Sequence, residues 1–328
     1  MVTPHSLAWL VALLAFTGSC RSREPAPSAT ATASATASAR AASPPKPATG
    51  PQALLFLPVS AYQASIGMDD DAVYVFTSTA VHRIVVGKPT ETFPRELGAV
   101  ATMTSQGIVY WSKGKLLEAP KGGGDARELG AVPRQPQRLA ASHERLAWID
   151  KDADKSSIQT LAADGPEVLY RAPGALDAIA LLGDDVFFVE RLSAQSWRVG
   201  RIATRGGQAR FANERRGRSP GQLAVFGDAL YFQDPNGYKV LELSRDLEHE
   251  RVLARDVVCS PLAAWERVYC AQVEGLVEVA GGGGPPRLVA PNARGLITAL
   301  AANATKVAWL SDAGADQLTV KMLVRESR

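Results

Sequence analysis

The sequence predicts an all-β protein in which a four-stranded unit is repeated seven times. The first observation is a short apolar and aromatic strand that recurs along the chain, with its third residue at Val75, Trp111, Trp148, Phe188, Phe232, Cys270 and Trp309. Successive copies lie 36 to 44 residues apart, which is close to the period of a four-stranded propeller blade. Helical periodicity is not evident over any long window. These features predict a seven-bladed β-propeller over residues 53–328.

Each repeat has the same four parts in the same order. A strand of small and aliphatic residues that ends in a polar turn precedes the recurring strand, as at 175–185 and 221–228. An alternating strand follows it, as at 197–203 and 239–245, and a Gly-rich or charged turn then leads to a last strand such as 250–257. The turn residues stand where tight turns need them. A β-sandwich with accidental spacing would not give this order seven times.

The last blade lacks a strand of its own. The seventh repeat has three strands, the third being 317–324, before the sequence ends. The apolar segment 53–58 has no repeat of its own, and it precedes the first repeat as 167–173 precedes the fourth. We therefore expect 53–58 to complete the last blade, which closes the ring without an open edge.

One repeat carries a resemblance to a known family. The second repeat reads IVYWS at 108–112, followed by GKL at 114–116 and PKGG at 120–123. This pattern resembles the repeat of bacterial secreted propellers related to the YWTD type, and the other six repeats look like degenerate versions. Those propellers commonly have six blades, against the seven counted here. The resemblance implies a binding or scaffolding role, although a fold does not determine function.

The amino terminus resembles that of a bacterial lipoprotein. Leu7 to Phe16 is an unbroken apolar run, which is shorter than the roughly 20 residues of a membrane span and is typical of a signal peptide. Thr17 to Cys20 (TGSC) follows directly and resembles a lipobox. The resemblance implies a diacylglyceryl group on Cys20, cleavage before it and acylation of the new amino terminus. We therefore expect a signal peptide at 1–19, with ordinary cleavage near the same place as the alternative.

Residues 20–52 are dominated by Ala, Ser, Thr and Pro, without a large apolar side chain. Such a segment cannot bury a core, so we expect a disordered tether that its prolines partly extend. Arg21, rather than Asp, follows Cys20, which resembles the sorting pattern for the outer membrane of Gram-negative bacteria. We expect an exported lipoprotein of the outer membrane or cell surface, attached to the membrane through its lipid.

The net charge of +3 resides in this tether. Before residue 53 there are four basic residues and one acidic residue, which leaves 36 − 4 = 32 basic and 33 − 1 = 32 acidic residues in the propeller. A nucleic-acid footprint needs a basic excess, so we expect no nucleic-acid partner. We expect a monomer.

Two cysteines flank the first hairpin of the sixth repeat. If its turn centres on Ala264-Trp265, Cys259 and Cys270 stand directly opposite each other. Opposed residues have Cβ atoms about 4.5–5.5 Å apart, which is close to disulfide geometry, and an exported compartment is oxidising. We expect a disulfide, with buried free thiols or half a metal site as the alternatives.

No catalytic or metal-binding signature is evident. His82, His143 and His249 fall in different repeats, so we do not expect them to meet at one metal. The three aspartates at 69–71 could suggest calcium, but acids recur in the same turn of later repeats, where they cap backbone N–H groups. The inner strands carry mainly aliphatic residues. We expect no cofactor and no enzymatic activity, with a hydrolase or lyase in the central channel as the alternative.

The predicted partner surface is the face that carries the second-to-third-strand loops and the connections between blades. Its candidate residues are three acids, two aromatic residues and three arginines: Asp150, Asp152, Asp154, Trp197, Tyr238, Arg215, Arg216 and Arg218. An acidic patch beside a basic one suits a protein or polysaccharide partner, and solvated loops without a ligand are the alternative. The sequence thus favours a binding or scaffolding module, or else a subunit of an outer-membrane assembly complex.

Overall fold

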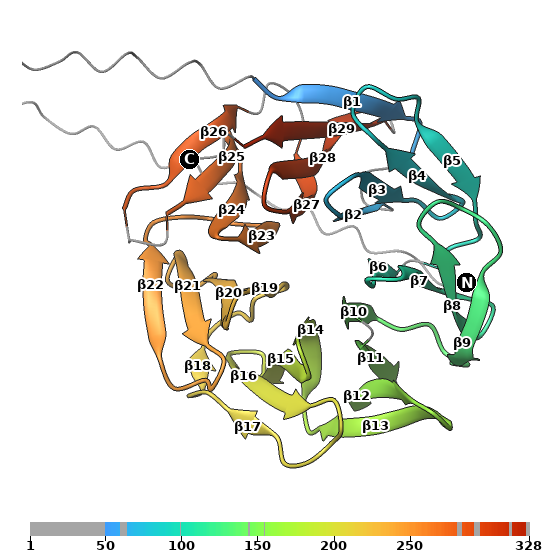
Figure 1. Ribbon diagram of the computed structural model, residues 1–328. Coiled ribbons are helices and arrows are strands. Elements are labelled where there is room, and N and C mark those ends of the chain that lie inside the picture. The colour runs from blue at the N-terminus through green and yellow to red at the C-terminus, as the bar shows by residue number, and fades with distance from the viewer. Residues whose placement is uncertain are drawn as a thin grey trace, which may run out of the picture. The chain divides into compact units, whose positions relative to one another are not determined.

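The chain folds into seven small antiparallel sheets arranged in a ring, as a computed structural model shows (Figure 1). The structure describes residues 50–59, 64–98, 100–143, 145–153, 155–280, 284–291, 296–314 and 317–325. These residues form 29 strands and no helix, so none of them belongs to a helix that could cross a membrane. The predicted seven-bladed β-propeller is confirmed. The predicted signal peptide, Cys20, most of the predicted tether and Asp154 lie outside the described residues.

The first four blades follow one another along the chain. Blade 1 is β2 (Ser65–Met68), β3 (Val73–Phe76), β4 (Ala80–Ile84) and β5 (Glu91–Pro94). Blade 2 is β6 (Ala101–Met103), β7 (Gly107–Ser112), β8 (Lys115–Pro120) and β9 (Arg127–Ala131). Blade 3 is β10 (Arg138–Ser142), β11 (Arg145–Asp152), β12 (Lys155–Ala162) and β13 (Gly165–Ala172). Blade 4 is β14 (Ala175–Leu182), β15 (Asp185–Ser193) and β16 (Ser196–Ala203), with β17 (Arg210–Phe211) and β18 (Arg215–Arg216) both paired with β16.

The last three blades complete the ring. Blade 5 is β19 (Ala224–Phe226), β20 (Ala229–Asp234), β21 (Lys239–Ser244) and β22 (Glu250–Ala254). Blade 6 is β23 (Leu262–Trp265), β24 (Arg267–Gln272), β25 (Gly275–Val279) and β26 (Arg287–Pro291). Blade 7 is β27 (Ile297–Ala302), β28 (Lys306–Gly314), β29 (Gln317–Val324) and β1 (Gln52–Leu57).

Strand β1 closes the ring, as the sequence predicts, one residue earlier than expected. It pairs antiparallel with β29, in a register that runs from Gln52 opposite Met322 to Leu57 opposite Leu318. The innermost strands also touch around the whole circle, and β27 of blade 7 contacts β2 of blade 1. Segments from the two ends of the propeller therefore share one sheet (Figure 1).

The hydrophobic core lies between the blades. The buried side chains fall into seven clusters, each made by the facing sides of two neighbouring blades. Both faces of a second strand are therefore covered, and all four residues of β3 are buried. This double burial explains why the recurring segments are unbroken apolar runs instead of alternating ones.

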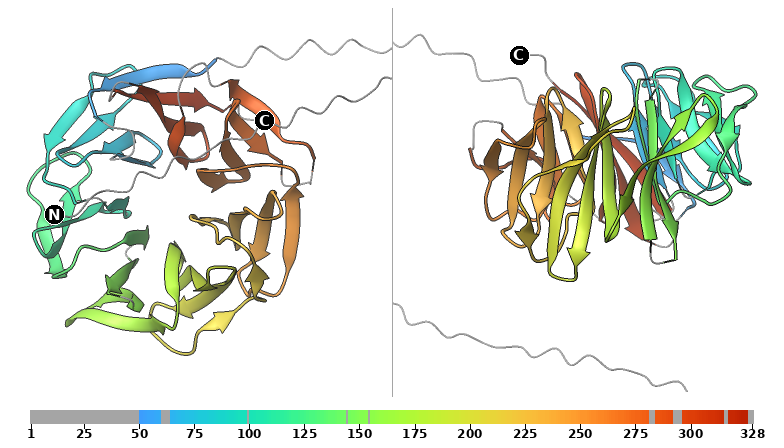
Figure 2. Two further views of the ribbon diagram at one scale, coloured as in Figure 1. Left: turned by 180° about the vertical axis from the view of Figure 1, so that it is seen from behind. Right: turned by 90° about the horizontal axis from the view of Figure 1, so that it is seen from below.

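The strands run across the thickness of the ring and define two faces (Figure 2). The loops between second and third strands and the connections between blades emerge on one face, which we call the loop face. The first-to-second and third-to-fourth turns emerge on the other, the turn face. Charged pairs join blades on the turn face: Arg145 Nε lies 3.1 Å from Asp184 Oδ1, and Arg245 Nη2 lies 2.6 Å from Asp185 Oδ2.

The predicted capping role of the turn acids is confirmed at Asp69. Its Oδ1 accepts hydrogen bonds from the N–H groups of Asp71 and Ala72, at 3.0 and 2.9 Å, and Oδ2 accepts one from the Tyr74 hydroxyl at 3.1 Å. Burial alone would raise the pKa of Asp69, but these hydrogen bonds lower it below its ordinary value of 3.8. The Asn303 side chain donates to the Asp69 carbonyl at 2.7 Å, which fastens blade 7 to blade 1.

A repeated ion pair joins the third and fourth strands of several blades. It links residues that face each other in the ladder and that lie eight or nine positions apart in the chain: Arg83–Glu91, Glu118–Arg127, Glu242–Arg251 and Glu278–Arg287. Opposite charges in such cross-strand positions stabilise a sheet. These ion pairs stabilise the blades, and their charges are not available to a ligand.

Candidate ligand-binding depression on the loop face

The loop face carries a depression of about 730 Å³ over blades 3 to 6. Its lining comes from the start of β10, from blade 4, from the β20–β21 loop and from the connections that enter blades 5 and 6. A volume of this size falls in the range of pockets that hold small molecules, about 300–1,000 Å³. The depression lies on the face predicted to bind a partner.

Two predicted partner residues, Arg218 and Tyr238, line the depression together. Arg218 belongs to the connection between blades 4 and 5, and Tyr238 to the loop between β20 and β21. Both side chains are exposed, Tyr238 to 54%. The structure therefore brings together an arginine and a tyrosine that lie 20 positions apart in the chain.

The side chain of Asn236 fastens these two segments to each other. Its Oδ1 accepts the Arg218 N–H at 2.8 Å, and its Nδ2 donates to the carbonyls of Arg218 and Arg216, at 2.9 and 3.1 Å. Gly217, between the two arginines, has φ +92°, and a Cβ there would lie 2.2 Å from Asn236 Oδ1. Glycine is therefore required for this close approach. Asn236 is not among the candidate residues predicted from the sequence.

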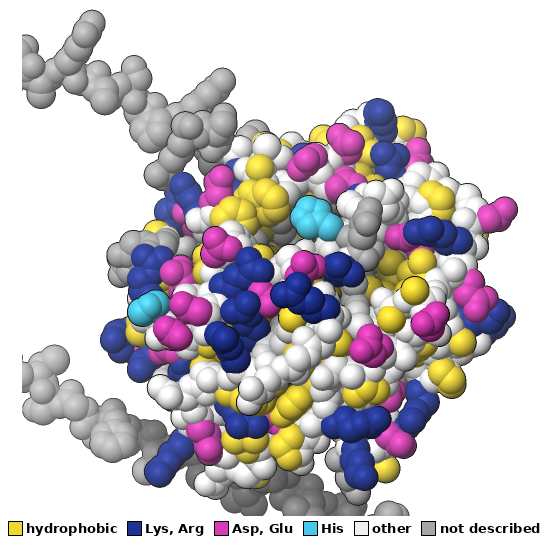
Figure 3. Space-filling view, turned by 60° about the horizontal axis from the view of Figure 1, so that its bottom comes forward, with side chains coloured by type: hydrophobic (Ala, Val, Ile, Leu, Met, Phe, Trp, Pro, Cys, Tyr) yellow, Lys and Arg dark blue, Asp and Glu magenta, His cyan; other side chains and the backbone are white. Residues whose placement is uncertain are grey.

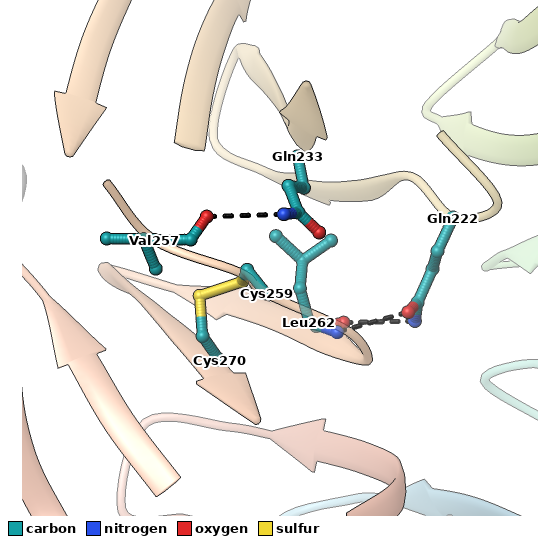
Figure 4. Close-up of a disulfide and its surroundings, with 6 residues drawn as sticks. All are labelled: Gln222, Gln233, Val257, Cys259, Leu262 and Cys270. Atoms are coloured by element: carbon teal, nitrogen blue, oxygen red, sulfur yellow. Dashed lines mark hydrogen bonds between the residues drawn. A yellow bond between two sulfur atoms is a disulfide. The ribbon is translucent and has the colours of Figure 1, made fainter. Parts of the chain in front are cut away.

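Glutamine side chains hold the part of the depression near blade 6 (Figure 4). Gln222 Nε2 donates to the Leu262 carbonyl, and the Leu262 N–H donates to Gln222 Oε1, both at 3.0 Å. The amide thus pairs with the inner edge of β23 as a neighbouring strand would. Gln233 Nε2 donates to the Val257 carbonyl at 3.2 Å. These bonds fix the connection between blades 5 and 6.

The predicted disulfide between Cys259 and Cys270 is present, with its Cα atoms 5.1 Å apart (Figure 4). The predicted register is wrong, because Cys270 pairs with Leu262 instead of Cys259. The turn is at Glu266, which has φ +51°, and not between Ala264 and Trp265. Cys259 therefore lies ahead of β23, and the disulfide ties the connection from blade 5 to the second strand of blade 6.

The charged lining of the depression is mainly cationic. It consists of Arg138, Arg191, Arg218 and Asp177. Asp177 is engaged, because its Oδ2 lies 3.3 Å from Arg191 Nε and accepts a hydrogen bond from Ser219 Oγ at 2.5 Å. Among the described residues, the guanidinium groups of Arg138 and Arg218 have no ion-pair or hydrogen-bond partner. The depression therefore offers two free cationic groups.

Two acids of the predicted acidic patch, Asp150 and Asp152, lie beside Arg134. Arg134 Nη1 lies 2.5 Å from Asp152 Oδ1, and its Nε lies 4.0 Å from Asp150 Oδ1. The Asp152 carboxylate raises the pKa of Arg134. Asp150 is buried and accepts a hydrogen bond from Gln159 at 3.1 Å. Neither acid lines the depression.

The prediction that Trp197 contacts a partner is wrong. Its side chain is fully buried between blades 4 and 5, where it packs edge-on against Phe232 with ring centroids 6.0 Å apart. Trp197 lies on the same side of β16 as Val199, and that side faces the neighbouring blade. The sequence signal that could have placed Trp197 inside is the alternation of apolar and polar residues in β16, where Arg198 stands between Trp197 and Val199.

Arg215 joins blades rather than facing solvent. Its guanidinium lies 5.4 Å from the ring centroids of Trp197 and Phe232, and it forms an ion pair with Glu250 of blade 5. Burial lowers the pKa of Arg215. Arg216 is exposed and does not line the depression. Its backbone carbonyl accepts a hydrogen bond from the Asn236 side chain. Of the three predicted arginines, Arg218 alone lines the depression.

The surface displayed in Figure 3 has Lys and Arg side chains close to Asp and Glu side chains, without a broad field of one sign. This mixture agrees with the formal neutrality of residues 53–328. What distinguishes the two free guanidinium groups of Arg138 and Arg218 is their position in the depression, not the charge of a whole face.

Comparison with known proteins identifies the architecture alone. No protein-family model matches the chain, and no curated protein sequence matches it either. A chain of the mitotic checkpoint complex has a TM-score of 0.62 at 9% identity, covering 90% of this chain and all of that one. The computationally designed Ika8 protein has a TM-score of 0.55 at 13% identity, covering 84% of this chain and all of the designed one.

PorZ, a bacterial surface component of the type-IX secretion system of Porphyromonas gingivalis, has a TM-score of 0.56 at 10% identity. The match covers 84% of this chain and 39% of PorZ. At these identities the similarity is one of fold, and a propeller fold serves many functions.

Proposed function

We propose that this chain is a lipid-anchored binding module of the bacterial cell envelope, and that it holds its partner at the depression on the loop face. The observation that carries the proposal is the depression itself, with the free guanidinium groups of Arg138 and Arg218 beside the exposed ring of Tyr238. Groups of this kind supply charge-assisted hydrogen bonds and a flat contact surface.

The frame around these groups supports the proposal. Asn236 holds the backbone of Arg218, Gln222 holds Leu262, and the disulfide holds Cys259. A site whose backbone is already fixed loses less conformational entropy when a partner binds. The turn face is less suitable, because its charged groups include Asp184 and Asp185, which are engaged with neighbouring blades.

The anchor is the second half of the proposal. It rests on the apolar run from Leu7 to Phe16, the lipobox-like segment that ends at Cys20, and the Ala/Ser/Thr/Pro-rich residues that follow. Radiolabelled palmitate supplied to cells should enter the full chain and be absent from the Cys20→Ser variant. Label retained by that variant would contradict the assignment of Cys20.

The binding role is tested by crosslinking in the native envelope, followed by identification of the captured partner. The full chain is compared with Arg138→Glu/Arg218→Glu. The control is Arg171→Glu/Arg205→Glu, which makes the same change in charge at two exposed arginines outside the depression. We expect capture to be lost in the first variant and kept in the control. Capture by both variants would overturn the proposal that the depression binds the partner.

A further inference from the structure

We infer that the ligand of the depression is a carboxylate-bearing saccharide of the uronic-acid type; this inference rests on the proposed binding function. The free cations of the depression suit a carboxylate. Arg138 and Arg218 present planar guanidinium groups, which match a carboxylate with two parallel hydrogen bonds. Arg191 already forms an ion pair with Asp177, so Arg138 and Arg218 are the arginines available to bind a negatively charged ligand.

Tyr238 is placed to contact a sugar ring. The residue is 54% exposed in the depression, and its backbone has φ +47°. A bulky residue in the left-handed region is uncommon and costs energy. The Val257 N–H donates to the Tyr238 carbonyl at 2.9 Å and helps to hold this conformation. A tyrosine offers an apolar ring face with a polar hydroxyl at its end, which suits the apolar face and hydroxyl rim of a pyranose.

The composition of the lining favours a saccharide over an acidic peptide. Protein interfaces have a core that is depleted of charge and enriched in apolar and aromatic side chains. Here two unpaired guanidinium groups lie in the depression, and Val258, 58% exposed, is its one large exposed aliphatic side chain among the described residues. The remaining groups open to a ligand include the Gln137 amide and the Ser260 hydroxyl, both on exposed residues. Such a lining fits a ligand rich in hydroxyl groups.

The test is isothermal titration calorimetry of the purified full chain with three probes. Hexagalacturonate carries six carboxylates on a saccharide, hexaglutamate carries six side-chain carboxylates on a peptide, and cellohexaose is a neutral saccharide. We expect hexagalacturonate to bind at one site, and the other two probes to bind at least about tenfold more weakly. Equal or tighter binding of hexaglutamate would overturn the inference in favour of an acidic peptide, and equal binding of cellohexaose would remove the role of the carboxylates.

Variants locate the binding. Arg138→Gln/Arg218→Gln should weaken hexagalacturonate binding by at least about tenfold, whereas the control Arg171→Gln/Arg205→Gln should leave it unchanged. Tyr238→Ala should weaken it similarly, and Tyr238→Phe, which keeps the ring, should retain most of the affinity. Circular dichroism checks that each variant is folded. Hexagalacturonate binding that ignores the Arg138 and Arg218 substitutions would place the saccharide elsewhere and overturn the inference.

The experiments distinguish a failure of the saccharide inference from a failure of the proposed binding function. If hexagalacturonate does not bind, but capture of an envelope partner still depends on Arg138 and Arg218, the saccharide inference is wrong and the binding function stands. If neither binding nor capture depends on these residues, both proposals are wrong.

Discussion

Breaking the Cys259–Cys270 disulfide should lower the stability of the propeller by a calculable amount. The bond closes a loop with a sequence separation of 11 residues. Constraining a loop of this length in the unfolded chain corresponds to about 3 kcal/mol at 25 °C. Both sulfur atoms lie in the core between blades 5 and 6, where Cys259 is 3% exposed and Cys270 is fully buried. A buried bond of this kind should reduce slowly unless the chain is partly unfolded.

The corresponding shift in melting temperature follows from the size of the ring. Unfolding entropy is about 2.1 cal/mol/K per residue, so the roughly 276 residues from 53 to 328 give about 0.6 kcal/mol/K. A loss of about 3 kcal/mol then lowers Tm by about 5 °C. The local effect should be largest in the connection that enters blade 6, because Cys259 is its covalent attachment to β24.

The assay is thermal unfolding followed by circular dichroism, with thiols counted after unfolding in denaturant. The oxidised chain should melt about 5 °C above the chain reduced in denaturant and refolded with reductant. The Cys259→Ala/Cys270→Ala variant should melt at one temperature in both conditions. Two results would contradict this prediction: free thiols at Cys259 and Cys270 in the untreated chain, or a complete reduction that leaves Tm unchanged.

Three further predictions concern the joints between segments. Asn236→Ala should weaken binding of the envelope partner and lower the free energy of unfolding by about 0.5–1.5 kcal/mol, because it removes three exposed hydrogen bonds to the backbone of Arg216 and Arg218. Chemical denaturation measures the stability, and an unchanged midpoint would contradict this role of Asn236. Arg215→Ala should lower the free energy of unfolding by about 2 kcal/mol. Because Arg215 and Glu250 form an ion pair between blades 4 and 5, a double-mutant cycle with Glu250→Ala should give a coupling energy above zero. Strictly additive effects of the two substitutions would contradict this pairing. Asp69 has a lower pKa folded than unfolded, so its contribution to stability is complete above its unfolded pKa near 3.8 and is lost as pH falls through the lower folded value. Asp69→Asn should flatten the acid side of the stability curve, and an unaltered curve would assign the acid sensitivity to other groups.

The fold was predictable because the blade pattern leaves a strong local trace. Second strands are covered on both faces, so they appear as unbroken apolar runs such as 73–76 and 186–189. The spacing of these runs gave the blade count, and the missing fourth strand of the last repeat pointed to the segment that became β1. Both features depend on the order of residues along the chain, which the sequence displays directly.

The candidate site was only partly predictable, because its geometry depends on contacts between distant segments. Alternation in β16 decides that Trp197 points toward blade 5, and nothing next to it in the chain indicates that Phe232 will cover it. Similarly, Asn236 acts on Arg218 from another loop. In the same way, Arg134 reaches from the connection between blades 2 and 3 to pair with Asp152 of the predicted acidic patch.

The Cys259–Cys270 pair shows how a prediction can succeed while its geometric reason fails. The expected register assumed a turn between Ala264 and Trp265, whereas the turn forms at Glu266 in the left-handed region. The small shift moves Cys259 off the ladder, yet the connection bends back far enough to bring the two Cα atoms within 5.1 Å. Turn position within a hairpin is a local choice that this sequence does not reveal.

The most direct test of the central claim is site-specific photocrosslinking in the native envelope. A photoreactive amino acid replaces Val258, which lines the depression and is 58% exposed, or the control Val86, which is 48% exposed and lies in a third-to-fourth turn of blade 1 on the turn face. If the partner binds at the depression, position 258 should give a discrete adduct that disappears in the Arg138→Glu/Arg218→Glu background, and position 86 should give no such adduct. An adduct from position 86 alone, or one from position 258 that persists without the two arginines, would contradict it.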